Sequence, residues 1–225
     1  MYAVLTGDIV DSNTASASLI AEALHDTYQR VQAVYEDALP YPLSVFRGDS
    51  WQMVIPDPAH ALSVSVLFRA ALRTELQRDT RIACAIDTVD TLDRNHITES
   101  TGAAFTRSGT ALDALEAPYR MQWLLPEAAS PPVQIAAAAL ADLADHIIIH
   151  WTDAQAQAVS LRLSTWLRNG DTSQRALAEQ WHPAPITQQA FSKHLQHAHW
   201  PRVRDALHQY RTLAPHLSSL SISNA

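Results

Sequence analysis

Two acidic turns occur early in the chain, in the stretches LTGDIVDS (residues 5–12) and FRGDSWQMVI (residues 46–55). Each places a Gly-Asp pair beside an apolar run, with the acids at Asp8 and Asp49. Two carboxylates held close together repel each other unless a cation bridges them or one takes a proton. Hard divalent cations favour carboxylate oxygens and substrate phosphates as ligands. The two turns therefore predict a site for Mg²⁺ or Mn²⁺ of the kind that serves phosphoryl transfer.

Neighbouring residues extend this prediction to a bound nucleotide. The backbone carbonyl of Ile9 could also reach the metal, and Asp11 is a third acid nearby. Gly7 and Gly48 would let the backbone approach a phosphate closely, and Arg47 is a candidate phosphate contact. A plainer alternative stays open, because Gly-Asp after a strand is a common turn in which Asp makes local hydrogen bonds.

The elements that position the two turns follow from hydrophobic periodicity. Apolar residues recur every three or four positions over 18–39, which predicts a helix that Pro40 and Pro42 end. The expected order is strand 2–7, helix 18–39, strands 43–47 and 51–55, helix 58–78, strand 81–89, a loop and helix within 99–117, and strand 119–125. This order matches a ferredoxin-like βαββαβ core with one more helix and strand. In such a core, the first strand and the hairpin bring Asp8 and Asp49 to one edge of the sheet.

The net charge of −7 is divided unevenly along the chain. Residues 1–150 carry 19 acidic and 9 basic side chains, a net charge of −10, whereas residues 151–225 carry 4 and 7, a net charge of +3. This asymmetry suggests a nucleic-acid partner for the second part. After a helix at 133–149 the pattern is helical throughout, over 153–168, 173–181, 187–198 and 201–213. We therefore expect an α+β chain with a sheet domain (1–128), a connecting helix (129–150), a helix-turn-helix domain (151–214) and a flexible tail (215–225).

Residues 172–200 carry the pattern of a helix-turn-helix. Small or apolar residues occupy the places where the two helices pack, at Ala178, Trp181, Ile186, Phe191 and Leu195. Thr187 is placed to cap the second helix. Residues that can contact bases or phosphates follow on that helix and after it, namely Thr187, Gln188, Gln189, Ser192, Lys193, Gln196, Arg202 and Arg204. The alternative is a helical packing or dimerisation domain with an ordinary polar face.

These motifs, taken in order, resemble those of the SatD family. Members of that family begin Tyr-x-x-x-x-Gly-Asp-Ile and carry Gly-Asp-x-x-Gln, a Gly-Ala-Phe-like segment and a C-terminal helix-turn-helix. Here the corresponding stretches read YAVLTGDI, GDSWQ, STGAAF (residues 100–105) and the helices after Trp151.

The first part also resembles the class III nucleotidyl cyclases. This resemblance implies that Asp8, Ile9 and Asp49 hold the metal, and that Glu99 and Gly102 lie at the nucleotide. Cyclases carry a base-selecting lysine before the second Gly-Asp, but the stretch here is LSVFR, without lysine. Their Asn and Arg after the late glycine would fall at Thr106 and near Thr110, and Arg107 is the nearest cation and the candidate catalytic residue.

We expect from these features a DNA-binding regulator with a metal-dependent, nucleotide-sensing domain. The alternative is a class III-like cyclase or other phosphoryl-transfer enzyme that acts on a nucleoside triphosphate, releases pyrophosphate and completes its site across a homodimer. A third possibility is a structural or partner-binding protein whose acidic turns are only turns. The start MYAVLTGD lacks the basic region of a signal peptide, no apolar run has membrane length, and Cys84 is the one cysteine, so we expect a cytoplasmic protein without a membrane partner.

Overall fold

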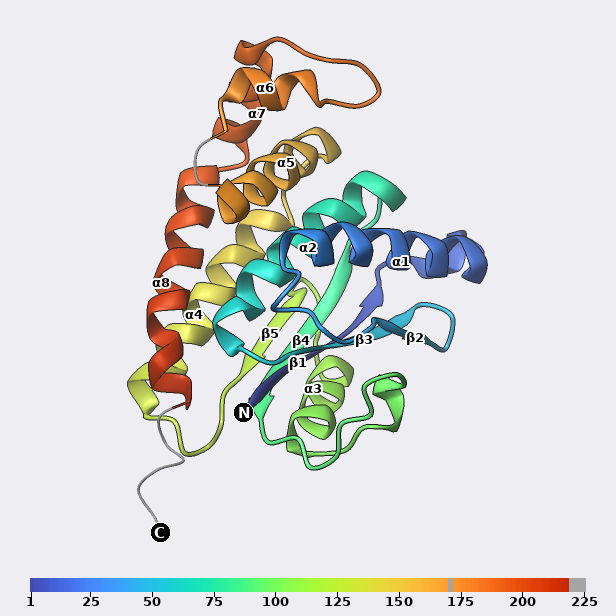
Figure 1. Ribbon diagram of the computed structural model, residues 1–225, viewed down its shortest axis with the longest axis vertical. Helices are drawn as coiled ribbons and strands as arrows, with labels where there is room; N and C mark the ends of the chain where they lie inside the picture. The colour runs from blue at the N-terminus through green and yellow to red at the C-terminus, as the bar shows by residue number, and fades with distance from the viewer. Residues whose placement is uncertain (170–171, 219–225) are drawn as a thin grey trace.

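A mixed five-stranded sheet lies between helices on its two faces (Figure 1). The computed structural model describes residues 1–169 and 172–218. In chain order the strands are β1 (Tyr2–Ile9), β2 (Ser44–Phe46), β3 (Ser50–Ile55), β4 (Thr80–Asp87) and β5 (Met121–Leu124). They are arranged β2-β3-β1-β4-β5, with β4 and β5 parallel and the other neighbours antiparallel. The expectation of a chain that mixes a sheet with helices is confirmed.

The alternation of side chains along β1 sets the two faces of the sheet. Ala3 and Leu5 pack in the large core under α1 (Ala17–Val34) and α2 (Ala61–Leu76), whereas Val4 packs on the side of α3 (Ala103–Asp113). Among the described residues, short 3-10 helices lie in three of the connections: η1 (Ser12–Thr14), η2 (Pro58–His60) and η3 (Ile97–Glu99).

The later helices pack against this body and extend it. They are α4 (Pro131–Ile148), α5 (Asp153–Asn169), α6 (Gln174–Glu179), α7 (Gln188–His197) and α8 (Trp200–Ser218). Helix α5 packs on α2, α8 runs alongside α4, and α6 and α7 lie at one end of the molecule (Figure 1). The indole N–H of Trp123 in β5 donates to the hydroxyl of Tyr210 in α8 at 3.0 Å, so the last helix reaches the sheet.

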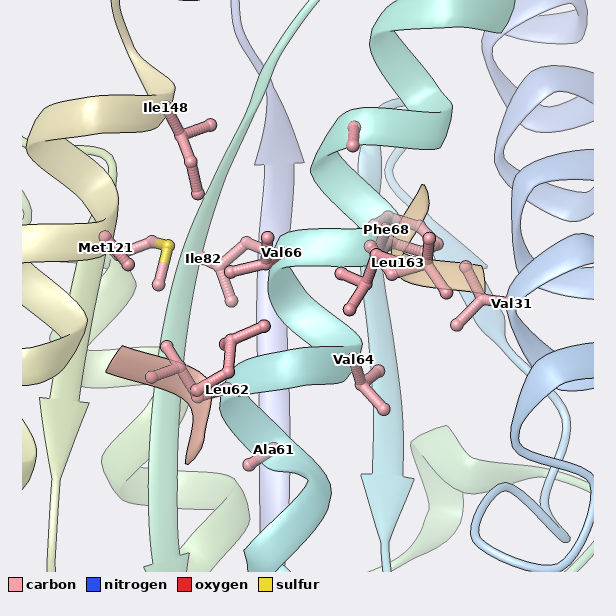
Figure 2. Close-up of a cluster of buried hydrophobic side chains, with 14 of the residues drawn as sticks. Val31, Ala61, Leu62, Val64, Val66, Phe68, Ile82, Met121, Ile148 and Leu163 are labelled. Atoms are coloured by element: carbon pink, nitrogen blue, oxygen red, sulfur yellow. The ribbon is translucent and has the colours of Figure 1, made fainter. Parts of the chain in front are cut away.

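One hydrophobic cluster runs through both parts of the chain. Figure 2 shows side chains of α2, including Leu62 and Val66, at the strand residue Ile82, with Ile148 of α4 beside them. Leu163 of α5 belongs to the same buried cluster. The predicted sheet and helical domains therefore share a core, although their boundaries stay predictions.

The predicted elements occur in the predicted order, with different ends. The first strand continues past residue 7 to Ile9 because it pairs with β3 and β4 on both sides. Helix α1 ends at Val34, before the two prolines, and α8 continues to Ser218, so residues 215–218 of the expected tail are helical. Residues 219–225 lie outside the described part. Within that part, no helix combines the length and the apolar character needed to cross a membrane.

Buried charges join α2 to the starts of β4 and β5. The fully buried Arg69 donates to Asp79 from Nε (2.9 Å) and Nη2 (2.7 Å), and to Asp145 of α4 from Nη1 (2.6 Å). Asp145 also accepts the backbone N–H groups of Arg120 (2.7 Å) and Met121 (3.0 Å). Burial alone would raise the pKa of Asp79, but the guanidinium groups of Arg69 and Arg120 outweigh it and lower that pKa to about 2.

We predict that Asp145→Asn lowers the free energy of unfolding by about 3–5 kcal/mol. All three partners of the Asp145 carboxylate are donors, so an amide nitrogen in its place leaves a donor unpaired and Arg69 undercompensated. Urea unfolding at neutral pH measures the change. Asp142→Asn on the exposed face of the same helix is the control and should stay within about 0.5 kcal/mol of wild type. Equal losses in the two variants would contradict the role given to this network.

Candidate functional site

Asp8 and Asp49 lie at the same end of the sheet, which we call the acidic edge. The antiparallel pairing of β1 and β3 places Asp8 opposite Ser50, and the N–H of Ile9 donates to the carbonyl of Asp49 at 3.2 Å. The sequence predicted this proximity of the two turns. Asp8 lies within the strand rather than after it.

A guanidinium group already holds one of the two carboxylates. Arg81 in β4 pairs with Asp8 across the sheet, and its Nε and Nη2 donate to the two carboxylate oxygens at 2.8 and 2.5 Å. Its Nη1 donates to the carbonyl of Leu115 at 2.9 Å. The pKa of Arg81 is raised, chiefly by the hydrogen bonds to Asp8, against the effect of burial, and then by the charges of Asp8, Asp113 and Asp49. The acidic edge thus carries its own cation.

The second carboxylate is held by hydroxyl groups. Asp49 accepts from Ser12 Oγ at 2.6 Å and from Ser50 Oγ at 3.3 Å. Carboxylate oxygens have room for further partners, so Asp49 fits a hard cation. Asp8 fits one only after Arg81 leaves it, since bidentate pairing engages both of its oxygens. A divalent cation at this edge is therefore in competition with Arg81.

The glycine before Asp8 is explained by packing. A Cβ on Gly7 would lie 2.4 Å from the ring of Trp51 and 2.5 Å from the carbonyl oxygen of Arg81. The Trp51 ring, which donates to Thr80 Oγ1 at 2.9 Å, covers this position. Close approach of the protein's own ring and backbone therefore accounts for Gly7 without a phosphate.

The remaining predicted residues near this edge lie in turns. Arg47 is exposed at the hairpin tip with φ of 54°, and Gly48 follows it with φ of +89°. Asp11 is exposed, also with positive φ, and its carbonyl accepts from Arg78 Nη1 at 3.0 Å. The structure brings these three residues to the same end of the sheet as Asp8, with Arg47 and Asp11 facing solvent.

Arg107, the candidate catalytic residue, lies far from the acidic edge. Its guanidinium pairs with Asp87 and donates from Nη2 to the carbonyl of Leu125 at 2.8 Å. Asp87 is opposite Tyr2, at the other end of β1 from Asp8. The six residue steps from Tyr2 to Asp8 span about 20 Å along the strand. Arg107 therefore cannot act at the two carboxylates within one chain.

Gly102 and Glu99, the residues implied at the nucleotide, lie toward that far end as well. Gly102 has φ of +142° at the start of α3, and a Cβ there would lie 2.7 Å from the carbonyl oxygen of Thr88, the residue after β4. Glu99 belongs to η3, whose Ile97 lies in the same buried cluster as Val4. The grouping of Glu99, Gly102 and Arg107 with Asp8 and Asp49 that the resemblance implies is thus not realised within a single chain.

Glu99 has acidic and imidazole neighbours of its own. Ligand atoms of Asp93, His96 and Glu99 lie within 4.8 Å of one another, a spacing compatible with a cation. Asp93 accepts the N–H groups of His96 (2.7 Å) and Asn95 (2.8 Å), which lowers its pKa. Local hydrogen bonds of this kind are typical of an Asp in a turn, so they explain the presence of Asp93 without a bound cation.

Sequence reasoning missed the polar groups that surround Asp8. Arg81 is the partner of Asp8, and on the same face of β1 Thr6 Oγ1 accepts from Gln52 at 2.9 Å and lies 2.8 Å from Ser108 Oγ of α3. The sequence did contain one signal for this arginine. Side chains alternate along a strand, so Arg81, the first residue of RIACAID, shares a face with Ala83, Ala85 and Asp87 and not with the apolar Ile82, Cys84 and Ile86. Which residue of β4 lies opposite Asp8 depends on the register between β1 and β4, and the sequence alone does not give that register.

A second candidate site is the pair α6 and α7. Ala178, Phe191 and Leu195 are buried between the helices, and the N–H of Ile186 donates to the carbonyl of Ala178 at 3.1 Å. Thr187 Oγ1 accepts from the N–H of Ala190 at 3.2 Å, which confirms the predicted cap of α7.

The outer face of α7 carries most of the predicted DNA contacts. It forms one side of a groove of about 530 Å³ that is lined by Gln174, Gln188, Gln189, Ser192, Lys193, Gln196 and His197. Arg202 is exposed at the start of α8, whereas Arg204 donates to the carboxylate of Asp205 at 2.8 and 3.1 Å. The hydroxyl of Thr187 accepts a hydrogen bond in the helix cap. The side chains that line the groove are therefore better placed than Thr187 to contact DNA.

Compared with protein-family models, curated proteins and solved structures, the chain matches none. The resemblances to the SatD family and to the class III cyclases therefore stay predictions from short motifs.

We predict that Arg81→Gln raises the affinity of the acidic edge for Mn²⁺ by about tenfold or more, because it removes the positive charge that competes for Asp8. Isothermal titration with Mn²⁺ measures the change. Arg107→Gln is the matched control, since it breaks an Arg–Asp pair of similar exposure at the other end of the sheet, and it should leave Mn²⁺ affinity unchanged. Adding Asp8→Asn to Arg81→Gln should abolish the gain. Unchanged Mn²⁺ affinity in Arg81→Gln would show that the acidic edge is not a cation site.

Proposed function

We propose that the chain is a DNA-binding regulator in which α6 and α7 form a helix-turn-helix and the sheet-bearing part senses a nucleotide. The observation that carries the DNA-binding proposal is the two-sided character of α7. Its inner side is anchored by the buried Phe191 and Leu195, and its outer side lines a polar groove. A recognition helix needs this arrangement, because one side must hold the helix while the other meets base edges.

The residue types of the groove suit DNA. Glutamine side chains can pair with adenine edges, and lysine can contact guanine or phosphate. Gln188 and Gln189 occupy the first turn of α7, the part of a recognition helix that contacts bases. The net charge of +3 over residues 151–225 favours approach to a polyanion.

For the sheet-bearing part we propose cation-assisted nucleotide binding at the acidic edge. The antiparallel order β2-β3-β1-β4, with α1 and α2 on one face, supports the ferredoxin-like assignment. Asp8 and Asp49 at one end of that sheet support binding of Mg²⁺ or Mn²⁺ with a triphosphate. Loading requires Arg81 to exchange Asp8 for the phosphate chain, and that exchange would couple ligand binding to a local rearrangement.

A phosphoryl-transfer enzyme is the second candidate, and the shared position of Asp8 and Asp49 is the observation that favours it. A homodimer would have to supply the remaining groups, since Arg107 lies at the other end of the sheet. Incubation with each nucleoside triphosphate and Mn²⁺ should then release pyrophosphate, and Asp8→Asn with Asp49→Asn should abolish the release. Release that survives the double substitution, or no release by wild type, would remove this candidate.

We predict that Lys193→Gln weakens binding to fragments of genomic DNA and lowers the slope of log affinity against log salt by about one. The lysine is exposed in the groove, and its loss removes one contact that releases counterions. Fluorescence anisotropy at several salt concentrations measures the slope.

Arg94→Gln is the control for this experiment, because it removes another exposed positive charge, from the loop between β4 and α3. It should leave the slope unchanged. Wild-type protein without salt-dependent DNA binding, or equal effects of the two substitutions, would overturn the DNA-binding proposal.

A further inference from the structure

A small arginine-lined pocket lies at the end of the sheet where β1 ends and where β4 and β5 begin. It has a volume of about 170 Å³ and is lined by Val10, Asp11, Arg73, Gln77, Arg78, Asp79 and Arg120. A water molecule takes about 30 Å³ in the liquid, so the space admits a small tetrahedral anion. We call it the arginine pocket. It uses neither the carboxylates of the acidic edge nor any residue of α7.

Arg73 is the unsatisfied member of this pocket. Its Nε is buried and has no hydrogen-bond partner among the described residues. Its nearest carboxylates are beyond hydrogen-bond distance, with Nη1 3.7 Å from Asp79 and Nη2 3.8 Å from the half-exposed Asp153. Buried donors are rarely left without an acceptor, and none of the guanidinium nitrogens of Arg73 has one within hydrogen-bond distance among the described residues. The side chain is 16% exposed and lines the pocket, so an external acceptor can reach the exposed part of it.

Asp79 cannot serve as that acceptor because other arginines engage it. Its two oxygens accept from Nε and Nη2 of Arg69, and Arg120 Nη1 donates to it as well at 2.8 Å. Arg78 is anchored by its bonds to the carbonyl of Asp11 and to Thr14. Three guanidinium groups thus line the pocket together with Asp11 and Asp79. The buried Arg69 divides its single charge between Asp79 and Asp145.

We propose that the arginine pocket binds a phosphate group, with Arg73 as its principal ligand. A guanidinium presents parallel N–H donors that match two oxygens of a phosphate. Arg120, with one nitrogen on Asp79, and Arg78, tied to the loop after β1, hold positive charge on the other walls. The phosphate is either free or the terminal group of a nucleotide, since both present the same tetrahedral dianion.

The test is isothermal titration with inorganic phosphate, at constant ionic strength maintained with chloride. Wild-type protein should give saturable binding with a dissociation constant of about 1 mM or tighter. Arg73→Gln should weaken it by about tenfold or more. Since Arg73 makes no hydrogen bond to the described residues that this change would break, the variant should keep the wild-type circular dichroism spectrum.

A second variant and a control keep the result interpretable. Gln77→Glu places a carboxylate at an exposed position of the pocket, where it would pair with Arg73 and repel phosphate, so it should weaken phosphate binding to a similar degree without removing an arginine. Arg94→Gln, with the same loss of charge in a distant loop, should bind phosphate within about twofold of wild type. Titration with ATP in the absence of metal identifies the source: equal dependence on Arg73 indicates a terminal nucleotide phosphate, and dependence of phosphate alone indicates the free ion.

Absence of saturable phosphate binding by wild type would overturn the proposal. Phosphate binding that is unchanged in both Arg73→Gln and Gln77→Glu would also overturn it. Neither result bears on DNA binding by α7 or on Mn²⁺ at the acidic edge, so the failure of this site and the failure of the proposed function are distinguishable.

Discussion

The guanidinium of Arg69 lies fully buried between Asp79 and Asp145, and the elements around the end of the sheet meet at this group. Burial costs several kcal/mol per ion unless each charge finds its partners, so α2 can dock only where both carboxylates are within reach. That requirement fixes the start of β4, because Asp79 immediately precedes Thr80, which pairs with Ile9. The register that follows sets Arg81 opposite Asp8. The acidic edge is therefore a consequence of the buried charge network as much as of the strands themselves.

The same network explains why Arg81 is hydrogen-bonded to a carboxylate whereas Arg73, at the same end of the sheet, is not. Arg81 has Asp8 to itself and engages both of its oxygens. Arg73 lies 3.7 Å from Asp79, but Arg69 and Arg120 already donate to that carboxylate. One carboxylate cannot satisfy three guanidinium groups, so the excess donor lines a pocket. Asp8 is thus paired through both oxygens, whereas Arg73 makes no hydrogen bond to the described residues, and an external anion would supply the missing acceptor.

The order of elements, the cap at Thr187 and the polar outer face of α7 could be predicted from the sequence. Periodicity and capping depend on residues close in sequence, so local patterns are sufficient for them. The chain order also sufficed to bring Asp8 near Asp49. The partner of Asp8 depends on the register of β4, a non-local property that a one-residue slip would change entirely. The sequence places Gly7 near a phosphate, and the cyclase resemblance places Gly102 at the nucleotide, yet their space is filled by Trp51 and by the backbone after β4. Motifs in the right chain order therefore did not guarantee one site.

Coupling between the sheet and the helices α6 and α7, which we propose bind DNA, would require a contact that differs between the free and the bound states. The packing of α5 on α2 is largely apolar and part of the common core, and packed cores change little when a small ligand binds. The ion pair of Arg73 with Asp153 is different in kind, since Asp153 is the first residue of α5 and the pair is loose at 3.8 Å. A phosphate on Arg73 would compete with Asp153 for the same guanidinium. The element that leads into α6 and α7 would thus sense the occupancy of the arginine pocket through its first residue, and by reciprocity DNA binding that shifts α5 would alter the affinity for phosphate.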